Sequence, residues 1–366
     1  MLGKVKKVFA GGNTGYGFYS HYDQIISVNE QALYILKGGP GTGKCSFMRW
    51  IGQQMRERGY DIEEFYCSSD NNSLDGVRIP ALGVALMDGT APHVMDPRYP
   101  AAFDTIVHLG DYWDDAGIRE NKDSVVALIR RNSFLFRRAY GYLRVAKEYN
   151  DQLQAYVGEL GVLDTVGLNR VARETIDSIF EGVPVNGGPS RQRHLFASAI
   201  TPQGLVNHLG SIVGELDRRV LVQGRPGTGR TSIVGKVAQA AIDRGYDVEI
   251  FHCALDPQRI DHVVIPDLSL AVVNSSEPHS YYAADPGDAI IDAEPFVDWA
   301  KLATYDHDIL RLTRLYHEAL NSAICLIGRA KKNHDQIEAH YAPHMNFAAL
   351  GERRAEVLAN ILALAR

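Results

Sequence analysis

The sequence predicts an α/β protein that contains two copies of one unit, and three observations lead to this fold class. Adding 186 to each position from 38 to 93 gives 23 identical residues in 56 gap-free pairs, which indicates an internal repeat. In each copy, an apolar strand leads through a glycine-rich turn into a helix. Two more apolar strands follow in each copy, so we expect two mostly parallel sheets flanked by helices.

The repeat covers nearly the whole chain. Before the first strand, Phe9 matches Phe196 at an offset of 187, and the last parts of the two copies match at an offset of 184. The joint lies in "EGVPVNGGPSRQ" (181–192), whose proline and glycine content is typical of a linker. We therefore predict repeat 1 over residues 1–185 and repeat 2 over residues 190–366.

Each copy is expected to contain the same elements in the same order. Apolar runs predict three strands per copy, at 32–37, 60–67 and 81–88 in repeat 1 and at 219–223, 246–253 and 267–274 in repeat 2. The helix after the first strand should end near residue 57 or 243. Because strand, helix and strand alternate in this order, we expect parallel pairing with right-handed crossovers.

Long helical segments follow each sheet, over about 115–180 and about 299–366. Apolar residues recur there at alternating steps of four and three, the spacing of a narrow apolar seam. The seam residues in repeat 1 are Leu135, Ala139, Tyr142, Ala146, Tyr149, Leu153, Tyr156 and Leu160. The simplest interpretation is a helical subdomain packed on its own sheet or on its twin. A docking surface for a protein partner is the alternative.

Bulk composition favours a soluble cytoplasmic protein. The formal net charge of −6 gives no broad positive field, so nucleic acid is not an expected partner. The four cysteines are scattered, as expected for reduced thiols in the cytoplasm. The sequence begins without an apolar core long enough for a signal peptide, and no apolar run is long enough to span a membrane. The oligomeric state is left open.

The two glycine-rich turns follow the pattern of phosphate-binding loops, which is Gly, four residues, Gly-Lys and then Ser or Thr. In such loops, glycines let consecutive backbone N–H groups at a helix N-terminus surround the phosphates. We expect a nucleotide to bind both turns. The predicted binding residues of loop 1 are Gly38, Gly39, Pro40, Gly41, Thr42, Gly43, Lys44, Cys45 and Ser46, and those of loop 2 are Gly224, Arg225, Pro226, Gly227, Thr228, Gly229, Arg230, Thr231 and Ser232.

The side chains beside these loops differ between the copies. Lys44 can neutralise phosphates as a point charge, whereas Arg230 replaces it with a bulkier planar group. The residue that follows normally gives a hydroxyl to Mg²⁺; Thr231 retains this hydroxyl, but Cys45 offers sulfur. Asp88 ends the third strand of repeat 1, where a magnesium-holding carboxylate is expected. We therefore expect site 1 to be catalytic, with Mg²⁺ on Asp88, and site 2 to be degenerate and regulatory.

These motifs resemble the P-loop NTPase superfamily. "GGPGTGKCSFM" and "GRPGTGRTSIV", with "GGNTGYGFYS" and "FASAITPQGLVN", are similar over essentially the full chain to a bacterial family of tandem P-loop proteins known only as ATPases or nucleotide kinases. The resemblance implies ATP binding by an α/β sheet flanked by helices. Cys45, Arg230 and Asn274 depart from the usual residues, at positions that magnesium-dependent turnover normally uses.

Three activities remain open at this point: hydrolysis of ATP, phosphoryl transfer to a small molecule or nucleotide, and a non-catalytic nucleotide-gated switch. Gly89, rather than glutamate, follows Asp88, which weakens the interpretation as a motor-type ATPase. A kinase needs a carboxylate near its acceptor, and Asp70 is the candidate, with Arg98 as a positive clamp.

Several arginines and histidines are further candidates for contact with the nucleotide. A switch could use an arginine that reaches the other half's nucleotide, with Arg191, Arg193 and Arg225 as candidates. His93 and His279 could sense the terminal phosphate, although loop-stabilising hydrogen bonds explain them more simply.

Overall fold

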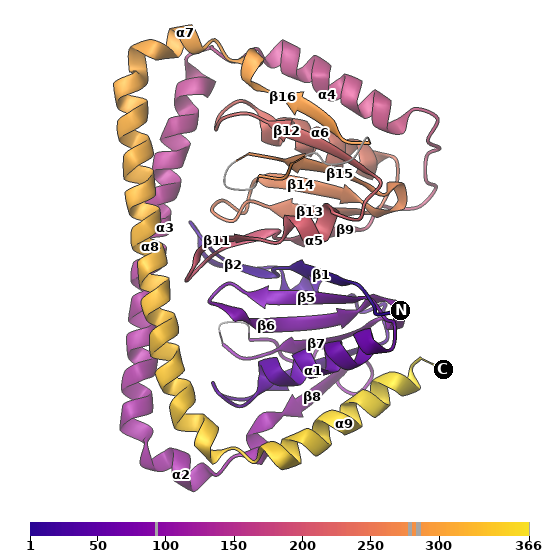
Figure 1. Cartoon of the computed structure of the whole chain (residues 1–366), viewed down its shortest axis with the longest axis vertical. Coiled ribbons are helices and arrows are strands. Elements are labelled where there is room, and N and C mark those ends of the chain that lie inside the picture. The colour runs from indigo at the N-terminus through magenta and orange to yellow at the C-terminus, as the bar shows by residue number, and fades with distance from the viewer. Residues whose placement is uncertain (92–93, 277–279, 283–286, 366) are drawn as a thin grey trace.

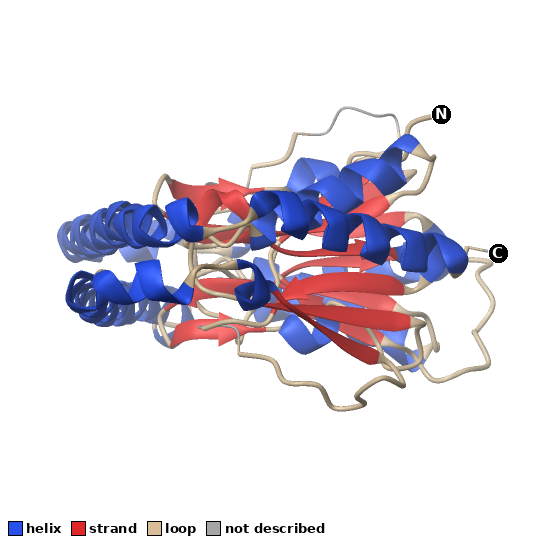
Figure 2. Ribbon diagram, turned by 90° about the horizontal axis from the view of Figure 1, so that it is seen from below, coloured by secondary structure: helices blue, strands red, loops and turns tan. Residues whose placement is uncertain are grey.

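The computed structural model of the chain describes residues 1–91, 94–276, 280–282 and 287–365. Two sheet-centred modules follow one another along the long axis, and two long helices run beside both of them (Figure 1). Seen from below, these helices lie together on one side of the sheets (Figure 2). The expected α/β class, with two similar sheet domains, is confirmed.

Each module contains a six-stranded mixed sheet with the same strand order. Module 1 has the order β1 (Val5–Val8), β5 (Ile62–Cys67), β6 (Asp70–Ile79), β7 (Val84–Asp88), β4 (Ala32–Lys37) and β8 (Asp104–His108). Module 2 has the order β9 (Gln192–Leu195), β13 (Val248–His252), β14 (Ile260–Ile265), β15 (Leu270–Asn274), β12 (Arg218–Gln223) and β16 (Ala289–Asp292). The described secondary structure outside the sheets includes hairpins β2 (Gly11–Thr14)–β3 (Gly17–Ser20) and β10 (Ser198–Thr201)–β11 (Gly204–Asn207), and the short helices α2 (Asp115–Glu120), α5 (Leu209–Val213) and α7 (Trp299–Leu302).

The sheets are mostly parallel, as expected, but the middle of each sheet is antiparallel. Strands β5, β6 and β7 form an antiparallel meander, as do β13, β14 and β15. Strand β6 was missed because its first half, "DNNS", is polar and does not alternate. The meander brings β7 beside β4 in parallel, and β8 pairs with the other edge of β4. The strand that leads into loop 1 therefore lies between two parallel neighbours.

Alternation along β4 divides the core of module 1 into two layers. Leu33 and Ile35 pack on one face, in a cluster that continues into module 2. Tyr34 and Leu36 pack on the other face, beneath α1 (Lys44–Glu57). Because both faces of the sheet are covered, the strand is a nearly continuous apolar run.

The modules meet at an antiparallel bridge between Phe9 and Phe196, whose N–H groups each donate to the other residue's carbonyl oxygen at 2.9 Å. Beside this bridge lies a cluster of four charged side chains, to which each module contributes one cation and one carboxylate at equivalent positions. Arg193 contacts Glu63 at 2.7 Å and Glu249 at 3.2 Å, and Lys6 is within salt-bridge distance of the same two carboxylates. Burial alone would raise the pKa of Glu63, but Arg193 and Lys6 lower it far below its ordinary value.

The two long helices, α3 (Lys122–Glu159) and α8 (Asp306–Tyr341), pack against each other in antiparallel directions (Figure 1). Small residues let them approach closely, and Ala139 and Ala146 face Ala319 and Ala323 in one cluster. The predicted seam is only partly correct, because the side chains of Tyr142 and Leu160 are exposed. We call these two helices the arms.

The helices that follow the arms are exchanged between the modules. Helix α4 (Thr165–Phe180) belongs to repeat 1, yet its apolar face packs with α6 (Arg230–Asp243) in module 2. Helix α9 (Phe347–Ala363) belongs to repeat 2 and packs with α1 in module 1. Figure 1 shows α4 and α9 at opposite ends of the molecule. Of the two packings allowed by the sequence, these helices therefore pack on the twin.

Among the described residues, no helix is long and apolar enough to cross a membrane.

Candidate phosphate-binding sites

Loop 1 connects the end of β4 to the first turn of α1, and Lys44 is the first residue of that helix. Gly43 is the residue before the helix and has a φ of 88°, which favours glycine. The Thr42 hydroxyl donates to the Gly39 carbonyl at 2.8 Å, which closes the turn. The Lys44 ammonium donates to the carbonyls of Gly38 and Gly39 at 2.9 and 2.8 Å. The Lys44 side chain thus extends back over the loop and contacts the residues at its start.

The carboxylate of Asp88 lies beside this lysine. Asp88 ends β7 and pairs in register with Leu36 of β4, just before loop 1. Its Oδ2 is 3.7 Å from Lys44 Nζ, and its Oδ1 accepts hydrogen bonds from the backbone N–H and the hydroxyl of Thr90. The structure thus brings the predicted site residues Lys44 and Asp88 close together.

The sulfur of Cys45 is turned toward the sheet. Its Sγ accepts a hydrogen bond from the Leu74 N–H at 3.3 Å and lies 3.8 Å from the Asn72 carbonyl. Ser46, the next residue, is exposed. Cys45 thus offers sulfur, whereas Asp88 offers the oxygen ligands that suit Mg²⁺.

Loop 2 has the same main-chain design. Gly229 precedes α6 with a φ of 85°, and the Thr228 hydroxyl donates to the Arg225 carbonyl at 2.8 Å. Thr231, the candidate magnesium ligand, is half-buried in the first turn of α6. The predicted strand, loop and helix therefore occur in both modules.

The side chain of Arg230 in loop 2 begins a series of hydrogen bonds that leads to the sheet of module 2. Arg230 Nη1 donates to Asn274 Oδ1 at 2.6 Å, and Asn274 Nδ2 donates to Asp261 Oδ1 at 3.4 Å. Burial lowers the pKa of Arg230 below its ordinary value. Arg225 contacts Glu294 at 2.8 Å and stacks on Trp299, with 3.4 Å between its guanidinium carbon and the ring centre.

Asp75 and Asp261 are buried carboxylates that the sequence analysis did not single out. Asp75 lies on β6, one residue before the Gly76–Met87 pair, so it lies next to Asp88 across the strands. It accepts a hydrogen bond of 2.5 Å from the hydroxyl of Tyr22. Burial, followed by the nearby Asp75, raises the pKa of Tyr22 well above its ordinary value. The identity of Asp75 and Asp261 between the repeats was the available signal.

Asp70, the candidate acceptor-positioning carboxylate, forms an ion pair with an arm. Its Oδ2 is 3.0 Å from Lys331 on α8, and its Oδ1 accepts from the Asn72 N–H. In module 2, Asp256 lies 3.5 Å from Lys147 on α3. Each strand-end carboxylate thus meets a lysine that comes from the other repeat.

The candidate arginines lie elsewhere. The side chain of Arg98 is exposed, and its backbone N–H donates to Asp104 at 2.6 Å. Arg193 belongs to the charge cluster between the modules, and Arg191 contacts Asp247 at 3.9 Å. Arg225 contacts Glu294 of its own module. These contacts place none of the three proposed arginine fingers on the opposite loop. His93 and His279 lie outside the described residues.

Each loop is covered by helices of the other repeat. A Cβ atom added to Gly39 would lie 3.0 Å from the Tyr341 ring, and one added to Gly41 would lie 2.8 Å from the carbonyl oxygen of Glu338. On loop 2, a Cβ atom added to Gly227 would lie 2.8 Å from Val157 of α3. Each candidate site is therefore built from both repeats: one repeat provides the glycine-rich loop, and the other provides the helix that packs over it.

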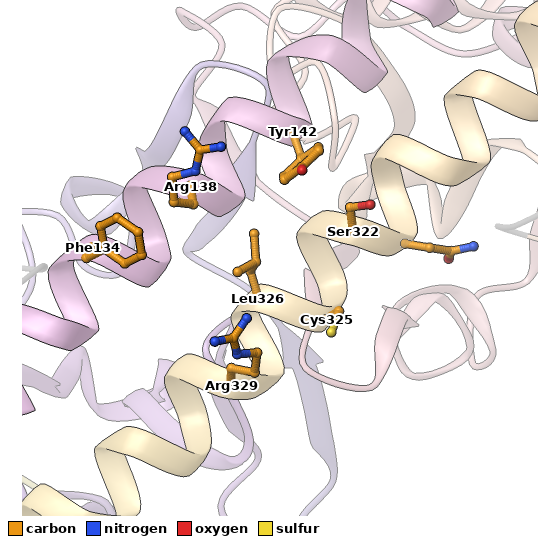
Figure 3. Close-up of a pocket in the computed structure, with 8 residues that line it drawn as sticks. Phe134, Arg138, Tyr142, Ser322, Cys325, Leu326 and Arg329 are labelled. Atoms are coloured by element: carbon orange, nitrogen blue, oxygen red, sulfur yellow. The ribbon is translucent and has the colours of Figure 1, made fainter.

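A separate groove of about 580 Å³ lies on the surface between the arms (Figure 3). Phe134, Arg138 and Tyr142 line it from α3, and Leu326 and Arg329 line it from α8. None of its lining residues belongs to a loop. In the described part of the chain, no group of three or more His, Cys, Asp or Glu residues could hold a metal ion.

Comparisons with protein families, with curated proteins and with solved structures found no match to this chain. The functional conclusion therefore depends on the geometry of the two loops.

Proposed function

We propose that the protein binds ATP at both loops, that site 1 hydrolyses or transfers the terminal phosphate with Mg²⁺, and that site 2 is regulatory. The observation that carries this proposal is the position of Lys44. It starts a helix, spans the carbonyls of its own loop and lies beside Asp88. Backbone N–H groups and the helix dipole favour an anion at this place.

Asp88 is the residue that would hold Mg²⁺ at site 1, together with water and phosphate oxygens. A bound magnesium ion would neutralise charge on the phosphates. Lys44 has less than a fifth of its side chain exposed, so its charge is poorly screened by solvent. At site 2, Arg230 already donates to Asn274, and a neutral amide replaces the carboxylate. This difference supports slow or absent turnover there.

A nucleotide-gated switch is the second candidate function, and one observation favours it over a kinase. Both loops are covered by helices from the opposite repeat, so binding at either loop involves both halves of the chain. The kinase alternative depends on Asp70, whose carboxylate is paired with Lys331. A kinase would have to break that ion pair to use Asp70 on an acceptor.

Titration calorimetry with ATP and Mg²⁺ tests the proposal. We expect two binding events in the wild-type protein and the loss of one of them in Lys44→Ala. Incubation with γ-labelled ATP and pools of nucleosides and metabolites then separates the activities: a labelled acceptor indicates a kinase, whereas free phosphate indicates hydrolysis. The absence of any heat with ATP or GTP would refute nucleotide binding at these loops.

A further inference from the structure

The C-terminal end of α8 packs directly against loop 1. The Glu338 carboxylate lies close enough to the backbone N–H of Gly41, in the middle of the loop, for that N–H to help lower the pKa of the carboxylate. The main chain of the same residue is equally close, because a Cβ atom on Gly41 would lie 3.1 Å from its Cα. An anionic side chain from repeat 2 thus lies beside the N–H groups of loop 1.

His334 has the largest effect on the pKa of this carboxylate. His334 lies one turn earlier on α8, with its Nε2 3.5 Å from Glu338 Oε1. A hydrogen bond from His334 lowers the pKa of Glu338 below its ordinary value, and this effect outweighs the opposing effect of burial. At neutral pH the loop therefore faces a negative charge.

The equivalent arm positions over loop 2 carry no charge. At the offset of 184 that relates the arms, Glu338 corresponds to Gln154 and His334 corresponds to Asn150. The contact with loop 2 is made instead by Val157, next to Gly227. The ionised pair on the arm is thus specific to site 1.

We propose that Glu338 is a built-in anion in the phosphate cradle of loop 1, and that a nucleotide binds this loop by displacing it. This inference rests on the proposed function, because it assumes that the loop binds nucleotide phosphates. A carboxylate and a phosphate need the same N–H groups and repel each other, so the loop holds one of them at a time.

Displacement of Glu338 would also move the residues that follow it in the chain. Only a single helical turn at Ala342–His344 separates the end of α8 from α9, which packs in the core of module 1. The ring of Tyr341 lies between loop 1 and Trp113, with 5.9 Å between the two ring centres. Binding at loop 1 would therefore move the start of α9 and alter the surroundings of Trp113. Loop 2 has its own tryptophan, Trp299, which stacks on Arg225.

The test measures binding of ATP with Mg²⁺ to Glu338→Gln and Glu338→Ala through the fluorescence of Trp113, in a background that carries Trp50→Phe and Trp299→Phe and so retains Trp113 as its one tryptophan. Hydrogen bonds that involve a charged group are the stronger kind, so we expect Glu338→Ala to bind about tenfold more tightly than the parent at loop 1. The isosteric Gln variant should show a smaller gain. In the parent, ATP should also speed amide hydrogen exchange over residues 338–346.

Gln154→Glu is the matched control, because it places a carboxylate at the equivalent position of α3. It should weaken ATP binding at loop 2, followed through Trp299 in a Trp50→Phe, Trp113→Phe background. Binding at loop 1, followed in the background that retains Trp113, should be unchanged.

Equal or weaker binding by both Glu338 variants, with binding still lost in Lys44→Ala, would overturn this inference and leave the proposed function intact. No ATP binding to any variant would overturn both.

Discussion

Loop 1 and loop 2 have the same main-chain shape, but they use their cationic side chains in different ways. Lys44 bonds to carbonyls of its own loop and lies 3.7 Å from an acidic partner, Asp88. Arg230 instead donates to the neutral Asn274. The comparison shows that two loops can keep the same main-chain form while the side chains around them make different hydrogen bonds.

The same contrast extends to the edge of each sheet. Asp104 in module 1 and Asp288 in module 2 are equivalent at the offset of 184. Asp104 accepts hydrogen bonds from the backbone N–H groups of Arg98 and Tyr99, both at 2.6 Å. The side chain of Asp288 is 2.6 Å from the guanidinium of Arg219, whose counterpart in module 1 is Leu33. Module 2 therefore has a buried ion pair at this edge of the sheet.

Arg219→Leu should have the largest effect on this comparison, because it installs the residue that module 1 has at position 33. Arg219 and Asp288 are each only 1% exposed, so losing the guanidinium leaves a buried charge. We expect a loss of about 3–5 kcal/mol in the free energy of unfolding, measured by urea denaturation. Adding Asp288→Asn should recover part of the loss. An unchanged unfolding midpoint would show that the ion pair does not stabilise module 2.

The exchanged helices provide the next test. Ile361 of α9 is buried in module 1, and Ile179 of α4 is buried in module 2. Each change to alanine should cost about 3 kcal/mol. Hydrogen exchange should rise in α1 for Ile361→Ala and in α6 for Ile179→Ala. The reverse pattern would mean that each helix packs on the sheet of its own repeat.

Lys44→Ala and Arg230→Ala compare the loops directly. If site 1 turns over ATP, we expect Lys44→Ala to reduce the rate by roughly a hundredfold, or about 2.7 kcal/mol, because a charge at the transferring phosphate is lost. Arg230→Ala should change the rate less than about threefold and act mainly on affinity. Phosphate release at saturating ATP measures both. Loss of turnover in Arg230→Ala alone would assign catalysis to module 2.

The smallest effect concerns histidines at the junction of the modules. Burial lowers the pKa of His21 and His252 to about 4. The unfolded chain binds these protons at a higher pH than the folded chain does. The contribution of the two histidines to the free energy of unfolding is therefore fully present above about pH 6.5, and it is lost as the pH falls toward 4. After allowance for solvent screening, we expect about 1 kcal/mol for each histidine.

Position 252 in repeat 2 corresponds to Tyr66 in repeat 1, which provides matched variants. His252→Tyr should reduce the decrease in the free energy of unfolding between pH 7.5 and pH 5. Tyr66→His should increase that decrease. Urea midpoints at both pH values measure this difference. Parallel pH curves for both variants and the parent would contradict the assignment.

Sequence reasoning located the loops well because their chemistry is local. Glycines at 41 and 43 and a lysine at 44 predict a strand, a turn and a helix from neighbouring residues alone, and the turn has this form. Asp88 was found because it ends an apolar run. Strand β6 was missed because its polar start gives no period, although it carries the buried Asp75.

The contacts across the repeats could not be predicted in the same way. Glu338 lies almost 300 positions from Gly41 in the sequence, and nothing near either residue indicates their proximity. The repeating apolar seam predicted long helices, but its period does not say which sheet they cover. Only the tertiary arrangement determines that Asp70 meets Lys331 and that Asp256 meets Lys147.

The exchange of α4 and α9 has a consequence for how such a chain can arise and be divided. A protein with one repeat could close its core only by lending its last helix to a second copy, so its stable form would be an intertwined homodimer. Fusion of two such copies would keep every contact and free each half to diverge. Conversely, the halves produced as separate polypeptides should assemble with each other, while either half alone would leave an apolar sheet face uncovered.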